Sequence, residues 1–535
     1  MAELLHLPTD NVVDVVVVGA GLCGLALARR LVARGLSVTL LEARERIGGR
    51  VLTHHDPQSG LALDMGATWY WPETEPRIGA LIDELGLATL PQHDPGDALW
   101  MTDPNREPER RQEAAGVHAG ARRIRGGAAR LAQALAASLP EGCLQLGKAV
   151  SALRDRGAHI DLLLESGAPL RARKVVLALP PRLVHDRMRL DPPLPAAVLD
   201  AMNTSATWMA THAKALVAFD RPFWRESGQS GNAFVRHAQG VLGEVFDACD
   251  GHGAALGGFV ALGPDQRTHF QRGLPLLIDS QLAQLYGVDA QSGRLQLQDW
   301  ALEPWTCSAT DRATVPEPPL ADPLLRQPLW AGRVFLAGSE TAAHGAGHME
   351  GALEAADRIA RALLRERAPL PEHAEPTVLT REAALAAFAE SVAARTAAAP
   401  DQYRRHLTRL LSWQSHDLLT QRALLATADR VYSDSLAQID VLLPALDAAS
   451  AVVEQGQHAL TPRLLSAFAG WNKGLMQAAL AFNASSCALS NFQQDQTPDA
   501  EMQRAIALDL AAAWREFALE LNARLLQAQT MACGA

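Results

Sequence analysis

A run of mostly β-branched residues that leads straight into closely spaced glycines limits most strongly what this chain can fold into. The run Val12–Val18 predicts a central parallel strand buried on both faces. The glycines of GAGLCG follow, and the next residues, LALARRLVARGL, have the pattern of a helix. Gly19 permits a tight turn, Gly21 lets backbone approach a pyrophosphate, and Gly24 lets the helix pack close to the strand.

A second predicted strand, SVTLLEA, ends in Glu42, which lies 18 residues beyond Gly24. An acid at this distance accepts hydrogen bonds from a ribose and disfavours a 2′-phosphate. Strand, glycines, helix, strand and acid occur here in order. They therefore predict a dinucleotide-binding α/β unit rather than a tight turn without a ligand.

Length and composition narrow the class of protein further. The 535 residues exceed the roughly 250–300 at which single cores stop growing, so we expect two or three domains. The balance of 49 Lys+Arg against 59 Asp+Glu argues against nucleic acid as the main partner. Six cysteines without metal-ligand spacing predict a reduced, cytoplasmic chain with no metal site. We predict neither a signal peptide nor a transmembrane segment.

The segments after Glu42 resemble the flavin amine oxidases. The resemblance begins with ARERIGGRVLTHH and LDMGATWYWPET and covers residues 11–368. It implies a Rossmann-like FAD-binding domain of the amine oxidase type with an α+β substrate domain. Further matching segments, in the order the family requires, are RIRGGAARLAQALAASL, KVVLALPPRL, KALVAFDRPFW, DWALEPWTCSAT and VFLAGSETAAHGAGHMEGALEAADR.

The resemblance also implies which residues contact FAD. Arg50 would neutralise phosphate charge, Arg44 would lie near the adenosine ribose, and the Val150 backbone would meet adenine. Glu340 would hydrogen-bond ribityl or ribose hydroxyls, and the Met349 backbone would meet the pyrimidine end of the flavin. The full set of implied contacts is Gly19, Ala20, Gly21, Gly24, Glu42, Ala43, Arg44, Gly48, Gly49, Arg50, Gly66, Ala67, Thr68, Trp69, Val150, Trp300, Trp305, Gly338, Ser339, Glu340, His348 and Met349.

Lys214 stands eight residues before Pro222 and is the first candidate catalytic residue. A lysine so placed in the family holds a water against flavin N5, and a lysine in an apolar pocket orders water through its donors. The alternative is a surface lysine on an alternating strand. Trp300 and Trp305 would either meet the isoalloxazine ring or pack in a core.

Two departures from the family pattern concern the flavin and the substrate. The position of a flavin-linking cysteine is Ala309, and Cys307 lies two residues short, so we expect noncovalent FAD. Thr310 and His348 replace two cage tyrosines, which weakens cation–π recognition. His348 would accept a hydrogen bond from an ammonium or act as acid or base, or would merely line a polar wall. The predicted substrate-lining residues are Tyr70, Trp71, Thr310 and His348.

The expected reaction is the oxidation of a small-molecule amine. Hydride passes from the α-carbon to flavin N5, the imine is hydrolysed, and O2 reoxidises the flavin with release of H2O2. No arginine follows the DMG segment until Arg77, so we rank amines above α-amino acids. The alternatives are a flavin dehydrogenase or desaturase, an L-amino-acid oxidase with another acceptor, and a scaffold protein with a vestigial flavin site.

The connection 88–122 is short for the family, and we interpret the arginines in Arg106–Arg111 and Arg122–Arg125 as a solvated loop. The chain after the linker is Ala/Leu-rich, which predicts an all-α bundle with helices near 380–398, 401–413, 416–454, 461–492 and 499–530. Three roles stay open for the bundle: homo-oligomerisation, a roof over the active site, or binding of a partner. The expected division is FAD-binding parts 1–87, 123–198 and 303–368, connection 88–122, substrate domain 199–302, linker 369–379 and bundle 380–535.

Overall fold

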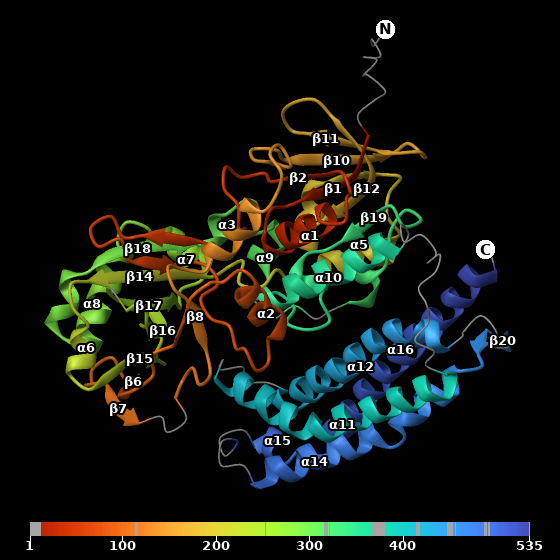
Figure 1. Ribbon diagram of the computed structural model, residues 1–535. Helices are drawn as coiled ribbons and strands as arrows, with labels where there is room; N and C mark the ends of the chain where they lie inside the picture. Colours follow the sequence, from red (N-terminus) through yellow and green to blue (C-terminus); the bar gives the residue numbers. More distant parts are fainter. Residues whose placement is uncertain are drawn as a thin grey trace. The chain divides into compact units, whose positions relative to one another are not determined.

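The computed structural model describes residues 12–112, 116–251, 253–314, 319, 322–365, 380–412, 418–446, 453–454, 456–485, 489 and 493–533. The chain divides into two compact units, Met1–Ala368 and Pro369–Ala535, each with hydrophobic core of its own. Strands and helices alternate in the first unit, whereas long helices dominate the second (Figure 1). The predicted linker 369–379 lies outside the described residues.

The first sheet of Met1–Ala368 has β1 at its centre, paired in parallel with β12 and β2. Val15 and Val17 belong to the hydrophobic core on one face, and Val16 and Val18 to the core on the other. This confirms the predicted doubly buried strand. The strands of this sheet are β13 (Arg189–Asp191), β10 (Val150–Asp155), β11 (Ile160–Leu164), β12 (Leu170–Leu177), β1 (Val12–Val18), β2 (Val38–Leu41) and β9 (Leu144–Gln145), with β19 (Val334–Leu336) on β12.

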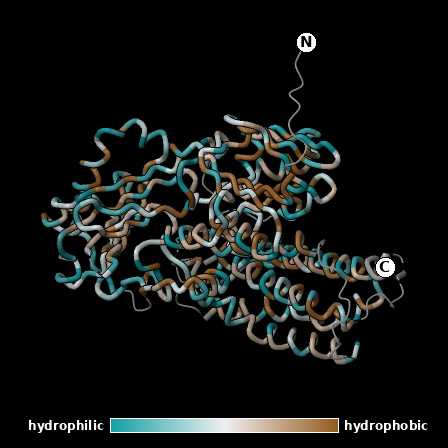
Figure 2. The backbone as a smooth tube through the Cα atoms, turned by 45° about the horizontal axis from the view of Figure 1, so that its top comes forward, coloured by the Kyte–Doolittle hydropathy of each residue, from teal (hydrophilic) through white to brown (hydrophobic). Residues whose placement is uncertain are grey.

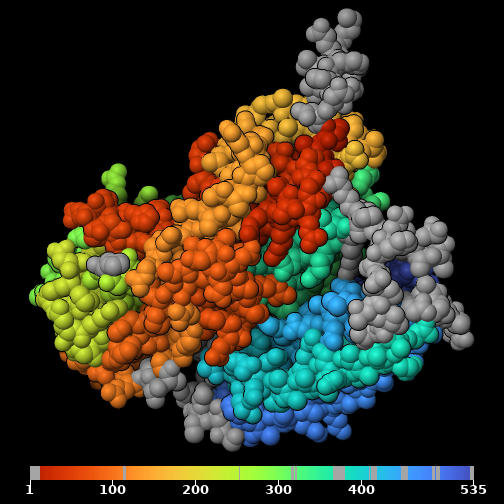
Figure 3. Space-filling view, in the orientation of Figure 1, coloured from red at the N-terminus to blue at the C-terminus, as the bar shows by residue number. Residues whose placement is uncertain are grey.

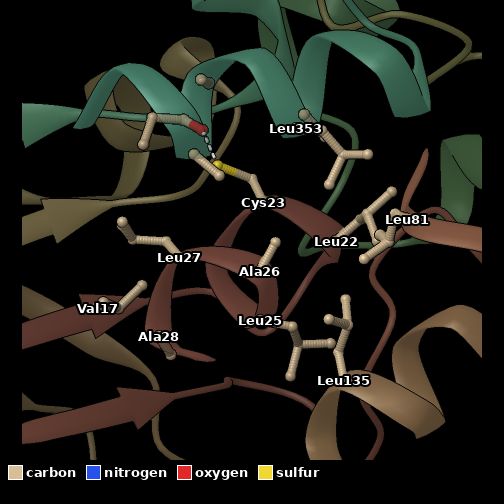
Figure 4. Packing of buried hydrophobic residues seen from close by; sticks show 14 of the residues in the cluster. Val17, Leu22, Cys23, Leu25, Ala26, Leu27, Ala28, Leu81, Leu135 and Leu353 are labelled. Atoms are coloured by element: carbon tan, nitrogen blue, oxygen red, sulfur yellow. Dashed lines mark hydrogen bonds between the residues drawn. The ribbon is translucent and has the colours of Figure 1, made fainter. Parts of the chain in front are cut away.

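Helices cover both faces of this sheet. Figure 4 shows the packing on one face, where Cys23 and Leu25 of α1 lie among Leu81, Leu135 and Leu353. The Cys23 thiol donates to the carbonyl oxygen of Ala337 at 2.7 Å, so this cysteine serves packing. The helices on this face are α1 (Leu22–Val32), α2 (Pro76–Glu84), α3 (Ala129–Ala137) and α10 (Met349–Arg365); α4 (Pro181–Arg187) and α5 (Ala196–Thr204) lie on the other.

The second sheet of this unit has seven strands and carries α8 (Leu274–Tyr286) against its core. In sheet order the strands are β18 (Arg294–Asp299), β14 (Ala213–Phe219), β17 (Ala254–Val260), β16 (Leu242–Asp247), β15 (Gln229–Val235), β6 (Asp97–Met101) and β7 (Glu109–Gln112). Smaller elements are the pairs β3 (Thr53–His55) with β4 (Ala62–Asp64) and β5 (Thr89–Pro91) with β8 (Arg122–Ile124), and the helices α6 (Phe223–Glu226), α7 (Pro264–His269) and α9 (Ala309–Ala313).

The connection 88–122 is more ordered than a solvated loop, because β6 pairs in parallel with β15 and extends the second sheet. In Figure 3 its orange residues lie against the yellow-green residues of that sheet. The predicted solvation holds for the exposed residues of β7, although these form a strand paired with β6 rather than a loop, and it is wrong for Arg123, which is only 3% exposed. Its guanidinium donates to the carbonyl oxygens of Cys249 and Ala248 at 3.0 and 3.1 Å, so backbone acceptors explain its burial.

The second unit is a helical bundle, as predicted. Its helices carry hydrophobic and hydrophilic residues along their length (Figure 2), and their buried side chains form one core. The helix predicted near 416–454, with a kink or break at Pro444, is α12 (Leu419–Leu446), which continues through Pro444. A short β20–β21 hairpin (Val453–Glu454, Gln457–His458) overlaps its predicted end. The helices are α11 (Arg381–Ser412), α12 (Leu419–Leu446), α13 (Thr461–Leu465), α14 (Trp471–Ser485), α15 (Gln493–Gln496) and α16 (Ala500–Cys533).

The predicted boundary between helices near 398–401 is wrong, because α11 continues through Pro400. An internal proline removes a backbone hydrogen bond and costs about 3 kcal/mol. The buried residues on both sides of it follow one helical stripe at spacings of four and seven residues. Packing of that stripe against α12 offsets the loss. The buried side chains of the stripe are Ala384, Phe388, Val392, Ala399, Tyr403 and Leu407.

Candidate active site

The turn after β1 is tight because two of its glycines, Gly19 and Gly24, lie where any side chain would meet backbone. Gly19 has φ +104°, and a Cβ there would lie 2.6 Å from the carbonyl oxygen of Ala178. A Cβ on Gly24 would lie 1.9 Å from the carbonyl oxygen of Gly19. Gly21 differs, since a Cβ there would meet no atom within 4 Å. The turn therefore leaves open space at the N-terminus of α1, where a phosphate group is favoured.

Glu42 lies at the end of β2 and is 4% exposed. Its carboxylate accepts hydrogen bonds from the backbone N–H groups of Ala20 at 2.9 Å and Arg44 at 3.0 Å. The Arg44 guanidinium donates to Glu303 at 3.0 Å, so this arginine is held by an ion pair rather than solvated. A carboxylate offers about four lone-pair positions, which leaves capacity for ribose hydroxyls.

The backbone before Val150 runs beside the end of β2. Lys148 donates its N–H to the carbonyl oxygen of Glu42 at 2.8 Å, and Gly147 donates to that of Arg44 at 3.0 Å. Val150 is the first residue of β10 and is 8% exposed. Ala43, which follows Glu42 after β2, is half-buried. The structure thus brings the predicted adenosine-side residues together.

The GGR turn packs directly on the first glycine turn. The Gly48 N–H donates to the carbonyl oxygen of Ala20 at 2.9 Å, and Gly48 and Gly49 have φ values of +96° and +59°. The predicted DMG segment lies on the same turn, because the Ala67 N–H donates to the carbonyl oxygen of Arg50 at 3.2 Å. A Cβ on Gly66 would lie 1.9 Å from that oxygen, so only glycine fits there.

Arg50 and Glu340 form a two-pronged ion pair. The guanidinium nitrogens lie 2.6 and 3.1 Å from the two carboxylate oxygens of Glu340, whose side chain is fully buried. Arg50 also donates to Ser339 Oγ at 2.9 Å and to the carbonyl oxygen of Trp208 at 3.1 Å. A Cβ on Gly338 would lie 2.2 Å from the carbonyl oxygen of Leu179, so the backbones approach closely here. Two predicted FAD contacts are therefore partners of each other.

Lys214 lies on β14 with 3% exposure, which excludes a surface position. Its Nζ donates to the carbonyl oxygen of Gly66 at 3.0 Å and to Thr68 Oγ1. Three aromatic rings surround the amine, with centroids 5.3–5.8 Å from Nζ: Phe246, Phe259 and Trp69. Lys214 of the second sheet thus reaches Gly66 and Thr68, which belong to the predicted FAD contacts Gly66–Trp69, here called the cofactor segment.

The environment of Lys214 disfavours its charged form. Burial lowers the pKa of Lys214 to about 7, against the opposing attraction of Asp64. Arg123 lowers this pKa further, and Glu244 raises it. Burial also raises the pKa of Asp64 above its usual range. An amine with this pKa exchanges a proton near neutral pH.

Hydrogen bonds hold the predicted aromatic residues in place. The indole N–H of Trp300 donates to the carbonyl oxygen of Met65 at 3.1 Å, which fixes Trp300 beside the DMG segment. The indole of Trp71 donates to the carbonyl oxygen of Ala119 at 3.2 Å. Tyr70 is 4% exposed and pairs through its backbone with Arg122.

His348 has an aromatic neighbour that sequence reasoning missed. The Trp208 ring centroid lies 5.4 Å from that of His348, with 40° between the planes. His348 Nδ1 lies 2.8 Å from the carbonyl oxygen of Ala346, so Nδ1 carries the proton and Nε2 is the acceptor of the neutral ring. Gly347 makes the approach of Trp208 feasible, because a Cβ there would lie 2.4 Å from the Trp208 Cβ. Met349 then starts α10 and is 8% exposed.

Thr310 and Trp305 have other neighbours. The hydroxyl of Thr310 on α9 donates to Oδ1 of Asn203 on α5 at 3.3 Å. The guanidinium of Arg187 lies 4.7 Å above the Trp305 ring and covers one of its faces. No group of three or more metal-ligating side chains occurs among the described residues. In that same part of the chain, no helix has the length and apolar character needed to cross a membrane.

Comparisons with known proteins identify the family of the chain. The family described as flavin containing amine oxidoreductase matches residues 22–116 and 109–364. Putrescine oxidase of Kocuria rosea is 27% identical over 64% of this chain and 92% of its own length, and amine oxidase [flavin-containing] B of Canis lupus familiaris is 24% identical over 67% and 87%.

Solved structures show the same fold. A putrescine oxidase, wild type bound to putrescine, aligns with TM-score 0.55 and 22% identity over 66% of this chain and 99% of that one. Cyclohexylamine oxidase from Brevibacterium oxydans aligns with TM-score 0.55 and 20% identity over the same shares. The first unit therefore has the amine oxidase fold, and the chain belongs to the flavin containing amine oxidoreductase family.

Proposed function

We propose that the protein is an oxidase of small-molecule amines that holds FAD noncovalently and passes electrons to O2. The observation that carries this proposal is the reach of Lys214 from the second sheet to Gly66 and Thr68 on the cofactor segment. The first sheet fits a dinucleotide, because the open position at Gly21 lies beside the carboxylate of Glu42. Bound FAD would supply the two-electron oxidation of the amine.

The residues that hold FAD in this proposal surround the two glycine turns. The N-terminus of α1 and the GGR turn would take the pyrophosphate, and Glu42 would take the adenosine ribose. Glu340 is already committed to Arg50, so the pair would act as one unit, with the carboxylate oriented by the guanidinium. Val150 and Met349 would contact the two ring systems through their backbones.

Noncovalent attachment follows from the thiol nearest the expected linkage position. Cys307 is buried, and burial raises the pKa of its thiol to about 12, so the nucleophilic thiolate is scarce. Ala309 offers no nucleophile. We expect denaturation in acid to release all flavin into the supernatant, measured by absorbance after the protein is removed. Flavin that stays with the precipitated chain would contradict this proposal.

Lys214 would manage the proton during amine oxidation. In its neutral form both N–H groups donate, to Gly66 and Thr68, and the nitrogen lone pair is left to accept a hydrogen bond from a water. The rings of Trp69, Phe246 and Phe259 limit access of bulk water to Nζ. A pKa of about 7 lets Lys214 Nζ take up and release a proton through that water near neutral pH.

Amines are the favoured substrate class because no arginine clamp for a carboxylate is free at the predicted place. Arg77 donates to Glu350 at 3.1 Å and lies 3.3 Å from Asp357. Glu350 also accepts the backbone N–H groups of Arg77 and Ile78 at 3.0 Å, so it caps the start of α2. This arginine is therefore structural.

An anaerobic absorbance titration of the FAD-loaded protein against a panel of amines and α-amino acids tests the function. We expect an amine to bleach the flavin, and stoichiometric H2O2 to appear when air is admitted. Bleaching without peroxide would make the protein a dehydrogenase. A flavin that no member of the panel bleaches would contradict the proposal and favour an interaction protein with a vestigial site.

Replacing Gly21 by Ala tests the cofactor cradle. The new Cβ would meet no protein atom, but it would enter the space proposed for the pyrophosphate. We expect FAD affinity to fall about tenfold or more, since each tenfold loss corresponds to about 1.4 kcal/mol, with the stability of the apoprotein unchanged. Gly79→Ala in α2 is the matched control, because it also adds a methyl group in open space and should leave FAD binding unaltered. Equal FAD affinity in both variants would argue against the cradle.

We also propose that FAD binding belongs to the first unit, in parts 1–87, 123–198 and 303–368, with residues 199–302 as substrate domain. The cores of the two units share no residue. We therefore expect a chain ending at Ala368 to fold and bind FAD, measured by flavin fluorescence quenching. Unchanged amine turnover in this chain would also exclude the bundle as a roof over the site, whereas loss of FAD binding would contradict the division.

A further inference from the structure

A buried histidine clamped between two carboxylates lies in the connection 88–122. His118 is 7% exposed. Its Nδ1 is 3.2 Å from Asp94 Oδ1, and its Nε2 is 3.7 Å from Glu244 Oε1. The His118 backbone N–H also donates to Asp94 Oδ2 at 2.8 Å. With an anion facing each ring nitrogen, the doubly protonated imidazolium satisfies both partners.

The ring of His118 stacks on a residue of the proposed active site. Its centroid lies 4.6 Å from that of Trp69, with 30° between the planes. The edge of Trp69 meets Phe246 at 4.6 Å and 69°, and the indole N–H donates to Gln92 Oε1 at 2.8 Å. Gln92 in turn donates to the carbonyl oxygen of Asp247 at 2.8 Å. The position of the indole is therefore set by His118, Gln92 and Phe246 together.

One carboxylate serves both buried bases. Glu244 on β16 forms an ion pair with His118 and attracts the charge of Lys214 on β14. The other charged groups that face Lys214 are Asp64 on β4 and Arg123 on β8. The Asp94 carboxylate also accepts a hydrogen bond from Asn232 Nδ2 at 3.0 Å, and its charge favours the protonated form of His93. The charge of Glu244 likewise favours the protonated form of Arg236.

We propose that His118 is a positioning residue for amine oxidation: clamped by Asp94 and Glu244, it holds Trp69 and balances the charge of Glu244 beside Lys214. The proposal rests on the function proposed above, because it assigns His118 an effect on Lys214. Burial opposes the imidazolium, but the two carboxylates outweigh it and raise the pKa of His118 to about 9. His118 therefore stays charged through the range in which Lys214 titrates.

Two substitutions should move the pH dependence of flavin reduction in opposite directions. His118→Gln removes a positive charge beside Glu244 and leaves it with less compensation, from Arg236. This favours the Lys214 ammonium. Glu244→Gln removes a negative neighbour and disfavours the ammonium. We expect the midpoint of the rate–pH profile to rise by about 0.5–1 unit in the first variant and to fall by a similar amount in the second. His118→Arg keeps charge and a planar stacking group, so its midpoint should stay near that of the unsubstituted protein.

The experiment is anaerobic stopped-flow reduction of the FAD-loaded protein by the best amine, from pH 5.5 to 9.5. His185→Gln is the matched control, because this histidine is about one-third exposed, pairs only with Asp186 among the described residues, and should not shift the midpoint. Midpoints that stay fixed, or that move in the same direction, in His118→Gln and Glu244→Gln would overturn the proposal. Failure of every amine to reduce the unsubstituted protein would instead overturn the proposed function.

A readout without turnover tests the charge of His118 directly. Its pKa is higher in the folded protein than in the unfolded chain, so its stabilising contribution is complete below pH 6.5 and is lost as pH rises through about 9. We expect the urea midpoint of His118→Gln to lie furthest below that of the unsubstituted protein near pH 6 and to approach it by pH 9.5. A difference in urea midpoint that does not change with pH would contradict the charged clamp. This test does not require turnover, so it applies even if His118→Gln does not retain FAD.

Discussion

Replacing Lys214 by Met is expected to slow amine oxidation by about 10²–10⁴-fold, the usual contribution of a positioned acid or base, while FAD stays bound. Methionine keeps the length and apolar character of the buried side chain but cannot donate to Gly66 and Thr68 or accept from a water. Stopped-flow absorbance separates flavin reduction from reoxidation and shows which half-reaction depends on the lysine. Unchanged rates in both would remove Lys214 from the catalytic machinery.

Lys473→Met is the matched control for this prediction. Lys473 is exposed on α14 of the bundle, so its loss should leave both rates within about twofold. In the unsubstituted protein, flavin reduction should rise with pH through about 7 as Lys214 loses its proton. The Lys214→Met variant should lack this step, since it lacks the titrating group.

The same substitution changes the pH dependence of stability in a direction that burial determines. The pKa of Lys214 is about 7 in the folded protein, well below its unfolded value of about 10.4. The unfolded chain therefore binds more protons between these values, and stability rises with pH there by up to about 1.4 kcal/mol per unit. The free energy of unfolding of Lys214→Met relative to the unsubstituted protein should fall as pH rises from 7 to 10. A constant difference in urea denaturation would contradict the lowered pKa.

Local patterns predicted the strand, the glycine turn and the acid of the proposed cofactor site, because these features follow one another closely in the sequence. The run VVVV of β1 requires burial on both faces, and a Cβ on Gly24 would meet the carbonyl oxygen of Gly19, only five residues earlier. The acid at Glu42 is reached after one helix and one strand. The resemblance to a known family added the later segments, and the family match bears it out.

Long-range pairing explains what local patterns did not predict. Strand β6 is short and follows a Pro- and Asp-rich stretch, and its pairing with β15, more than 100 residues away, joins it and its neighbour β7 to the second sheet. The sequence around Arg123 predicts a surface residue, because its acceptors, the carbonyl oxygens of Ala248 and Cys249, lie far away in the sequence. In the same way, the role of His118 depends on its ion pairs with Asp94 and Glu244, which the local sequence pattern does not indicate.

Trp208 shows a further limit of local patterns. It lies in a loop without periodicity, and the next residue, Met209, has φ +60°, which is rare for a non-glycine residue. Only the fold places its ring against His348 and its carbonyl oxygen on Arg50. Trp208 therefore places an aromatic ring next to His348, for which the sequence predicted no aromatic neighbour.

Replacing Arg50 by Ala is expected to destabilise the apoprotein by about 3–5 kcal/mol, the usual effect of leaving one buried partner of an ion pair uncompensated. Glu340 is fully buried and would lose both of its charge-assisted hydrogen bonds, while Ser339 and the carbonyl oxygen of Trp208 would each lose a donor. FAD affinity should fall as well, since the proposed pyrophosphate and ribityl contacts lose their shared support. Urea denaturation and flavin fluorescence measure the two effects separately.

The size of this effect depends on burial, which a double substitution can demonstrate. Arg50→Met combined with Glu340→Gln removes both charges, so it should be less destabilising than Arg50→Ala alone, because no ion is then left buried. Arg221→Ala is the exposed control: its pairs with Glu226 and Asp289 are about half exposed on both sides, and such pairs contribute about 0–1 kcal/mol each. A loss in Arg50→Ala as small as that in Arg221→Ala would show that water reaches Glu340 and solvates its charge. The pair would then be a dispensable surface contact, and Glu340 would be available to a ligand on its own.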